Sequence, residues 1–407
     1  MSWEILAALV FTLPGWRFFV LVLAATPLAY YIAATFAAWR FFSRERARAT
    51  ASYTPAASLL KPVHGVDFGA YENFASFCTQ DYSEYEILFG VGDSGDPAVP
   101  LIQRLMVEFP QKRIRLVVGA ERIGANRKVN MQARLAREAR HEVLVLTDGD
   151  IRVGRNYLRE VIAPLADRKL GAVTSFYRGI AEQNLGAELE AIGAASDFFA
   201  GVLMANWMEG MTFGLGASIV TTKERVARIG GFAAIADMLA DDYELGNRIV
   251  QAGGKILLSR EVVATMYTAQ SVRSFWQHQV RWTRTVRLSR PLSFVGLIFT
   301  HGLPWALLAA LIAPTAQVGA AYLMAYFVLR LIMAWTVGVW GVRDDVVRHK
   351  LWLVPLRDAI YFVVWLASFA SNRIHWGGEE YIMHSGRLVP RNASESPDSG
   401  AASEVRR

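Results

Sequence analysis

Two aspartates separated by one glycine follow a strongly apolar segment near the middle of the chain. The segment is Val143–Leu146, and after Thr147 come Asp148, Gly149 and Asp150. Four apolar residues in a row, two of them β-branched, predict a buried parallel strand. Because ligands of open α/β sheets bind beyond the carboxyl ends of the strands, the two carboxylates predict a site for a hard divalent cation and substrate phosphates.

The same residues are compatible with a plain turn whose carboxylates face water. Further groups favour chemistry: Asp93 ends another predicted strand, and Asp242 lies later in the same region. By their i, i+3, i+4 spacing, His278, Arg281 and Trp282 share one helix face. Carboxylates for a metal, a carboxylate base and an arginine for a leaving phosphate are what sugar transfer from a nucleotide sugar requires.

The segments that would position these side chains alternate between strand and helix patterns from Ala57 onward. Strands are predicted over 58–63, 85–92, 114–118 and 143–146, and helices over 68–78, 99–109 and 128–139. This alternation predicts βαβ units and a mostly parallel, doubly wound sheet of the nucleotide-binding type. No G-x-G-x-x-G follows the first strand and no Walker sequence occurs, which argues against dinucleotide and P-loop sites.

The composition indicates membrane segments beside a soluble domain. Of the 407 residues 53% are hydrophobic, and the mean hydropathy is +0.24. The net charge is +7, with arginines clustered beside apolar runs, which favours an anionic membrane surface over nucleic acid as the partner. The single cysteine, Cys78, excludes an intrachain disulfide and is expected in the core.

The first predicted span is the apolar run Phe18–Trp39, which is long enough to cross a bilayer. Four arginines follow it, so that this end is expected in the cytosol: Arg40, Arg44, Arg46 and Arg48. The apolar stretch within Gly186–Gly231 predicts either a core helix or a helix at the lipid boundary that admits an apolar acceptor.

The C-terminal third predicts a membrane hairpin. Ser271–Arg290 is basic and amphipathic, as in helices that lie on a membrane surface. The runs Leu292–Ala313 and Val318–Trp340 are each long enough to span. Leu351–Ser371 is interrupted by Arg357-Asp358, and because an ion pair inside a bilayer is costly we expect this segment to be re-entrant or interfacial.

A set of short motifs resembles the ceramide glucosyltransferases, whose bacterial relatives include the hopanoid-biosynthesis glycosyltransferases. The resemblance covers about residues 55 to 290, and the motifs together are specific although none is so alone. In order they are Lys61-Pro62, Gly65-Val66-Asp67, Gln80-Asp81-Tyr82, Asp93 with Asp96-Pro97-Ala98, Gly124…Asn126…Lys128…Asn130, Asp148-Gly149-Asp150-Ile151-Arg152-Val153, Asp241-Asp242-Tyr243 and Arg281-Trp282.

The resemblance implies a GT-A fold that acts by inversion, with Mg²⁺ or Mn²⁺ and a UDP-sugar donor. Asp148 and Asp150 match the D-x-D-type metal and diphosphate site, and Asp93 matches the aspartate that faces the nucleotide. The predicted donor-binding residues are Lys61, Asp93, Asn126, Lys128, Asp148 and Asp150.

On the acceptor side, Asp242 matches the base and Arg281 and Trp282 match the end of a (Q/R)xxRW motif. His278 stands where that motif has Gln or Arg, which resembles the hopanoid-type relatives more than the ceramide enzymes. A histidine there still donates a hydrogen bond, and its contact becomes pH-dependent near neutrality. Asp241 is expected to cap the following helix or to be a structural neighbour.

The sequence therefore predicts a GT-A domain between an N-terminal membrane helix and a C-terminal membrane hairpin. The expected parts are an anchor (1–48), the GT-A domain (49–270), an interfacial helix (271–291), a membrane region (292–372) and a tail (373–407) disordered from about 392.

The predicted function is transfer of a hexose from a UDP-sugar to a lipid, ceramide or a hopanoid. The enzyme would be integral to the bacterial inner membrane, face the cytosol and need no protein partner. The alternatives are a hopanoid-type (N-acetyl)glucosaminyl transferase, a processive polysaccharide synthase, and a lipid-binding or transport protein without enzymatic activity. A processive synthase would need more spans for a channel, and a transporter would need polar residues inside its spans.

Overall fold

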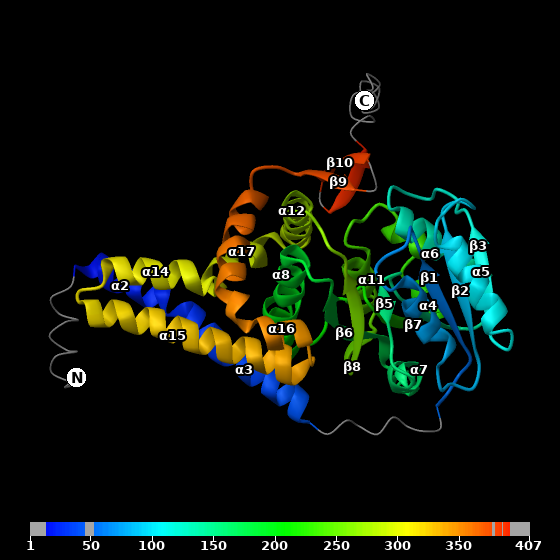
Figure 1. The fold of residues 1–407 in the computed structure, drawn as a ribbon, viewed down its shortest axis with the longest axis horizontal. Coiled ribbons are helices and arrows are strands. Elements are labelled where there is room, and N and C mark those ends of the chain that lie inside the picture. Colours follow the sequence, from blue (N-terminus) through cyan, green and yellow to red (C-terminus); the bar gives the residue numbers. More distant parts are fainter. Residues whose placement is uncertain (1–13, 45–52, 377–378, 385, 391–407) are drawn as a thin grey trace, which may run out of the picture.

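An α/β domain and a group of apolar helices lie side by side along the long axis of the molecule (Figure 1). The computed structural model describes residues 14–44, 53–376, 379–384 and 386–390. Residues 391–407 of the predicted tail (373–407), with its stretch expected to be disordered, and the arginines Arg46 and Arg48 lie outside these residues.

The α/β domain is built on one eight-stranded sheet of order β3-β2-β1-β4-β7-β6-β8-β5. Its first four strands pair in parallel as predicted, whereas β7 is antiparallel to β4 and β6, and β5 is antiparallel to β8. The strands are β1 (Ala57–Pro62), β2 (Tyr85–Val91), β3 (Arg113–Val118), β4 (Val143–Leu146), β5 (Ile151–Arg152), β6 (Leu170–Ala181), β7 (Ile219–Thr222) and β8 (Lys255–Tyr267).

Helices cover both faces of this sheet, and the central strands are largely apolar for that reason. Every residue of β2 and β4 is buried; Leu144 and Leu146 face one hydrophobic cluster and Val143 and Val145 the other. The helices are α4 (Ala70–Cys78), α5 (Val99–Glu108), α6 (Arg127–Glu138), α7 (Tyr157–Ile162), α8 (Leu185–Gly193), α9 (Phe199–Met208), α10 (Lys223–Arg228) and α11 (Asp241–Gln251), with short turns η1 (Ala163–Ala166), η2 (Ala194–Phe198) and η3 (Phe232–Ile235).

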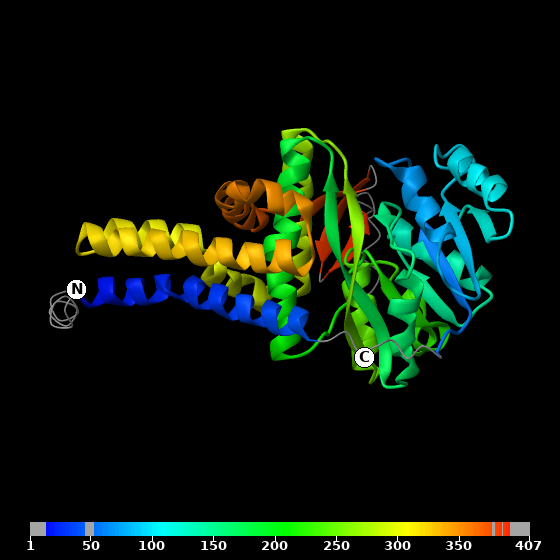
Figure 2. The same cartoon turned by 60° about the horizontal axis from the view of Figure 1, so that its bottom comes forward.

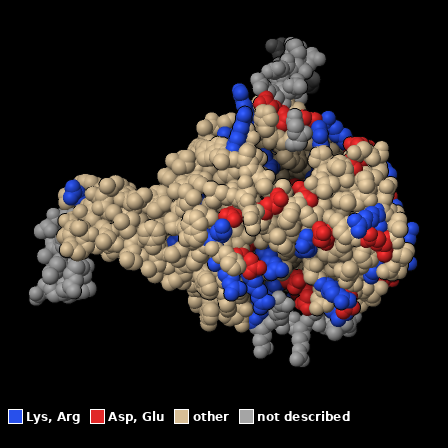
Figure 3. Space-filling model, in the orientation of Figure 1, with Lys and Arg blue, Asp and Glu red and all other residues tan. Residues whose placement is uncertain are grey.

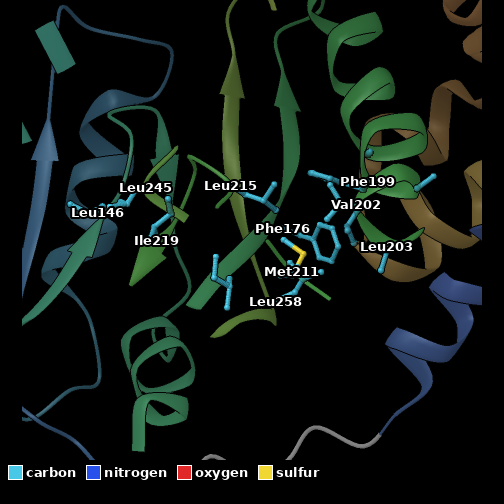
Figure 4. Packing of buried hydrophobic residues seen from close by; sticks show 14 of the residues in the cluster. Leu146, Phe176, Phe199, Val202, Leu203, Met211, Leu215, Ile219, Leu245 and Leu258 are labelled. Atoms are coloured by element: carbon cyan, nitrogen blue, oxygen red, sulfur yellow. The ribbon is translucent and has the colours of Figure 1, made fainter. Parts of the chain in front are cut away.

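The first of these clusters continues from the sheet into the helices on its membrane side, where Phe176 of β6 packs against Phe199 of α9 (Figure 4). The prediction of a core helix is confirmed for part of Gly186–Gly231. Phe199 and Leu203 are core residues, whereas Trp207 and Met208 at the end of α9 are 44% and 75% exposed.

Three helical segments are long and apolar enough to cross a membrane: Gly15–Ser43, Ala316–Gly341 and Asp345–Ser368. Much of Gly15–Ser43 and Ala316–Gly341 lies in an arm whose surface carries few charged side chains in the view of Figure 3, whereas Asp345–Ser368 lies nearer the α/β domain (Figure 1). The component helices are α2 (Gly15–Ala24), α3 (Thr26–Ser43), α15 (Ala316–Ala334), η5 (Trp335–Gly341), α16 (Asp345–Lys350), η6 (Leu351–Leu353) and α17 (Val354–Ser368).

Two segments of the C-terminal region have features that the sequence did not indicate. The run predicted as one span over Leu292–Ala313 is a pair of segments, Pro291–Thr300 and Gly302–Ile312, bent by 50° at His301. It comprises α13 (Pro291–Gly296), η4 (Leu297–Thr300) and α14 (Gly302–Ile312).

The segment expected to be re-entrant or interfacial lies largely within Asp345–Ser368, which is long and apolar enough to span, and its two charged residues have separate buried partners. Asp358 accepts hydrogen bonds from Arg330 over 2.8 and 2.9 Å and from Tyr326 over 2.9 Å. Arg357 donates to Oε1 of Gln279 over 2.9 Å, and Gln279 belongs to α12 (Val272–Ser289). This partnering reduces the cost that the sequence alone suggested.

The predicted basic amphipathic helix is α12, which buries Phe275 and Val280 on one side. A three-stranded antiparallel sheet after the last apolar helix was not predicted. Its strands are β9 (Arg373–Trp376), β10 (Glu379–His384) and β11 (Arg387–Pro390), in the order β11-β10-β9. This C-terminal sheet lies between the apolar helices and the α/β domain (Figure 2).

Candidate functional site

The carboxyl ends of the parallel strands open into a pocket of about 560 Å³. Asp93 follows β2, and Asp148 and Asp150 follow β4, so three predicted donor-binding carboxylates line it together with Lys128. The lining residues are Pro62, Val63, His64, Gly65, Asp67, Ala70, Phe74, Gly92, Asp93, Arg127, Lys128, Met131, Asp148, Gly149, Asp150, Trp376 and Tyr381.

Two lysines hold the loop that carries Asp148. Lys128 Nζ lies 2.6 Å from Asp148 Oδ1 and 3.4 Å from Asp241 Oδ2. Lys61 is buried in β1 beneath the pocket, and its Nζ donates to the Asp148 backbone carbonyl over 2.6 Å. Burial lowers the pKa of Lys61 to about 7, although the carboxylates of Asp150 and Asp148 act in the opposite direction. Lys61 therefore positions the loop and does not line the pocket.

Asp148 and Asp150 place two negative charges close together in a partly buried site. Burial, and after it the charge of Asp148, raise the pKa of Asp150 to about 6, against the lowering effects of the Thr265 hydrogen bond and of Lys61. This repulsion is the condition that a divalent cation relieves.

Carboxylate oxygens suit Mg²⁺ or Mn²⁺, and within the described part of the chain no group of three or more His, Cys, Asp or Glu side chains forms a full protein cage. The donor set therefore fits an ion held by these two aspartates and by phosphate oxygens of a substrate.

Asp242 lies in the first turn of α11 and faces Asp148 across Gly216. A Cβ atom on Gly216 would stand 3.0 Å from Asp242 Oδ2 and 3.4 Å from Asp148 Oδ2, so a glycine leaves room between the two carboxylates. The Tyr243 backbone N–H donates to Asp242 Oδ1 over 2.8 Å. Burial, and after it the charge of Asp241, raise the pKa of Asp242 to about 6. A carboxylate with this pKa can accept a proton near neutral pH.

Asp241 does not cap α11, which corrects one of the two roles expected for it. The N-cap is Ala240 and makes no side-chain hydrogen bond, whereas Asp241 is buried against Lys128. Asn126 caps α6 by accepting from the Val129 backbone N–H over 3.1 Å. It is buried and outside the pocket lining, so its contribution is to fix the helix that carries Lys128.

His278, Arg281 and Trp282 lie on α12, away from the pocket lining. His278 Nδ1 lies 2.6 Å from Glu190 Oε1, whose other oxygen accepts from Gln270 over 2.6 Å. Burial lowers the pKa of Arg281, although the charge of Glu190 acts in the opposite direction. Trp282 packs edge-on against Phe198 of η2, with ring centroids 4.9 Å apart.

Tyr177 of β6 lies near both the strand-end aspartates and Glu190, the partner of His278 on α12. Burial, and after it the charges of Asp242 and Glu190, raise the pKa of its phenol above the ordinary range, so that both carboxylates lie near this side chain. The charges of Asp150 and Asp148 raise this pKa as well, so Tyr177 lies between the α12 face and the aspartates of the strand ends.

Several residues of the site had not been predicted. Gly216 belongs to a Gly-x-Gly pattern that could have indicated a close approach of backbone to a ligand. Thr265 and Tyr177 are ordinary strand residues with no local signal. Trp376 and Tyr381 reach the pocket only because the chain returns from the membrane helices.

The family model of glycosyl transferase family 21 matches residues 19–389. Among curated proteins, the chain is 27% identical over 234 residues to ceramide glucosyltransferase 3 of Caenorhabditis elegans, covering 57% of this chain and 51% of that protein. For ceramide glucosyltransferase 1 of the same organism the identity is 25% over 231 residues, covering 56% and 49%. The chain thus spans about half the length of the curated relatives it matches.

Among solved structures, a mannosyltransferase from Pyrobaculum calidifontis in complex with GDP-Man and Mn²⁺ shares the fold. The TM-score is 0.55 at 17% identity, over 87% of this chain and 99% of that one.

Proposed function

The chain belongs to glycosyltransferase family 21, and we propose that it transfers a hexose from a UDP-sugar to the hydroxyl group of a lipid, with inversion at the anomeric carbon. The observation that carries this proposal is the joint position of Asp148, Asp150 and Lys128 in one pocket with Asp242 beside it. The relatives named as ceramide glucosyltransferases support a lipid acceptor, and the apolar helices supply access to one.

The donor would lie in the pocket at the strand ends, with its nucleotide near Asp93 and its diphosphate near Asp148 and Asp150. A Mg²⁺ or Mn²⁺ ion held there would supply positive charge to the diphosphate as it leaves. Lys128 adds a fixed positive charge, since the carboxylates of Asp148, Asp241 and Asp242 raise its pKa in spite of burial. Positive charge placed where negative charge develops is the main source of catalysis in such transfers.

Asp242 would act as the base. The acceptor oxygen attacks the anomeric carbon, the bond from that carbon to the diphosphate breaks, and the acceptor proton passes to the Asp242 carboxylate. UDP leaves with the bonding electron pair. One displacement of this kind inverts the anomeric centre.

The acceptor would approach from the membrane side of the site, past α12 and the exposed end of α9. His278, Arg281 and Trp282 are proposed to contact the acceptor or the leaving phosphate, with the charge of Arg281 supporting the leaving group. The positive-inside rule supports a cytosolic catalytic domain in a bacterial inner membrane. Ceramide and hopanoids are the two acceptor classes proposed, and a transfer assay separates them.

The test uses the full-length protein in detergent with UDP-sugars, a divalent metal and either ceramide or a hopanoid. We expect metal-dependent UDP release together with a glycolipid identified by mass spectrometry. Asp242→Asn should abolish most of the product. Asp167→Asn should not, because Asp167 is exposed and precedes the amino end of β6, whereas the donor residues follow the carboxyl ends of the parallel strands. UDP release without any lipid product, in the presence of both acceptors, would refute the lipid assignment.

A further inference from the structure

The donor pocket contains two aromatic residues from the C-terminal sheet. Trp376 of β9 and Tyr381 of β10 line the same pocket as Asp93 and Asp148, although they follow all of the apolar helices in the chain. The opposite wall is formed by strand-end and helix residues such as Val63 and is partly apolar. The pocket is therefore a slot between the α/β domain and the C-terminal sheet.

This sheet is fixed to the α/β domain by both apolar and polar contacts. Ile374, Tyr381, Met383 and Leu388 form a buried cluster with Ala125 and Leu239. The Leu388 backbone N–H donates to the Asp237 carbonyl over 2.7 Å, and Arg127 forms an ion pair with Glu379 over 2.5 Å. A docked sheet of this kind holds its side chains in defined positions and differs in this respect from an exposed tail.

The sheet is also held from the membrane side. Arg284 of α12 donates to the Arg373 carbonyl at the start of β9 over 2.7 Å, and Arg287 donates to Asn372. The element that carries the RW motif and the element that carries Trp376 are thus directly connected.

We propose that the C-terminal sheet forms the outer wall of the donor site and that Trp376 is a positioning residue that contacts the bound nucleoside diphosphate. The proposal rests on the proposed function, because it requires a nucleotide in the pocket. Tyr381 is 2% exposed and its hydroxyl donates to Glu379, so it mainly supports the wall. Trp376 packs against the buried cluster, is only partly buried and lines the pocket, so its indole can contact a ligand there. Aromatic side chains bind nucleobases by stacking without regard to base identity.

The first experiment measures UDP binding to the full-length protein in detergent with Mg²⁺, by isothermal titration calorimetry. We expect Trp376→Ala to raise the Kd on the order of tenfold, and Trp376→Phe to keep most of the affinity. The matched control is His375→Ala, at an exposed neighbour on the same strand whose side chain points to the other face. It should bind UDP as the wild type does.

Equal Kd values for the wild type and Trp376→Ala would overturn the proposal while leaving the proposed function intact. A wild-type protein that binds no UDP would instead refute the proposed donor. If Trp376→Ala does not fold, hydrogen exchange on the wild type decides: UDP should slow exchange at the amides of 374–376 and 381–383. Unchanged exchange there on addition of saturating UDP would also overturn the proposal.

Discussion

Replacement of Asp242 by asparagine tests the proposed base most sharply, because its neighbour Asp241 provides a matched control. Both residues begin α11, yet Asp242 borders the space beside Gly216 whereas Asp241 is buried against Lys128. Asparagine has almost the same shape as aspartate but cannot take the acceptor proton. A positioned base contributes roughly 10²–10⁴-fold to such reactions, so Asp242→Asn should lower the transfer rate by that factor.

The raised pKa of Asp242 adds a pH dependence whose sign is fixed. With a pKa of about 6, the base is mainly ionised at neutral pH and becomes protonated as the pH falls. At pH 5 only about one site in ten would carry the active form, so transfer should fall about tenfold from its plateau. Because the charge of Asp241 helps to raise this pKa, Asp241→Asn should move the acid limb to lower pH.

The assay is initial-rate glycolipid formation between pH 4.5 and 8 for the wild type and both variants, with melting temperatures and UDP affinities measured in parallel. Asp242→Asn should change neither the melting temperature nor the UDP affinity appreciably. Loss of transfer in Asp241→Asn together with near-normal transfer in Asp242→Asn would show that Asp241, and not Asp242, is the base. Normal transfer in both variants would refute the inverting mechanism proposed here.

Three further predictions follow from the same geometry. Asp150→Asn should weaken metal binding, measured by Mn²⁺ titration of UDP release, with an unchanged melting temperature; an unaltered metal requirement would remove Asp150 from the site. Gly216→Ala should lower transfer about tenfold with little loss of stability, because its Cβ would lie only 3.0 Å from Asp242 Oδ2. Full activity of this variant would show that transfer does not depend on the open space between Asp242 and Asp148. Protease added to intact cells should spare residues 49–290 and should cut them in inverted vesicles, and the reverse pattern would refute the cytosolic orientation.

Residues that follow buried strands were predictable because strand and ligand site are coupled in parallel sheets. Asp93, Asp148 and Asp150 come directly after apolar runs, and the structure brings them to one pocket as expected. The antiparallel strand β7 was not predicted, since its four residues Ile219–Thr222 carry too short a pattern to specify a partner.

The remaining differences arise from tertiary contacts that leave no local signal. Arg357 and Asp358 read as a costly adjacent pair in the sequence, whereas their partners Gln279 and Arg330 come from other elements. Trp376 reaches the donor pocket because the C-terminal sheet docks on the α/β domain, and no periodicity in a segment of four residues indicates that. The bend at His301 likewise interrupts a run whose composition suits one continuous span.

The configuration of the product tests the central claim most directly. The wild-type protein would be incubated with an α-linked UDP-hexose, Mg²⁺ and a lipid acceptor, and the glycolipid would be examined by NMR at its anomeric proton. The account predicts a β-linked hexose on the lipid hydroxyl, formed by the wild type and lost in Asp242→Asn. An α-linked product, or transfer to a growing sugar chain instead of the lipid, would contradict it.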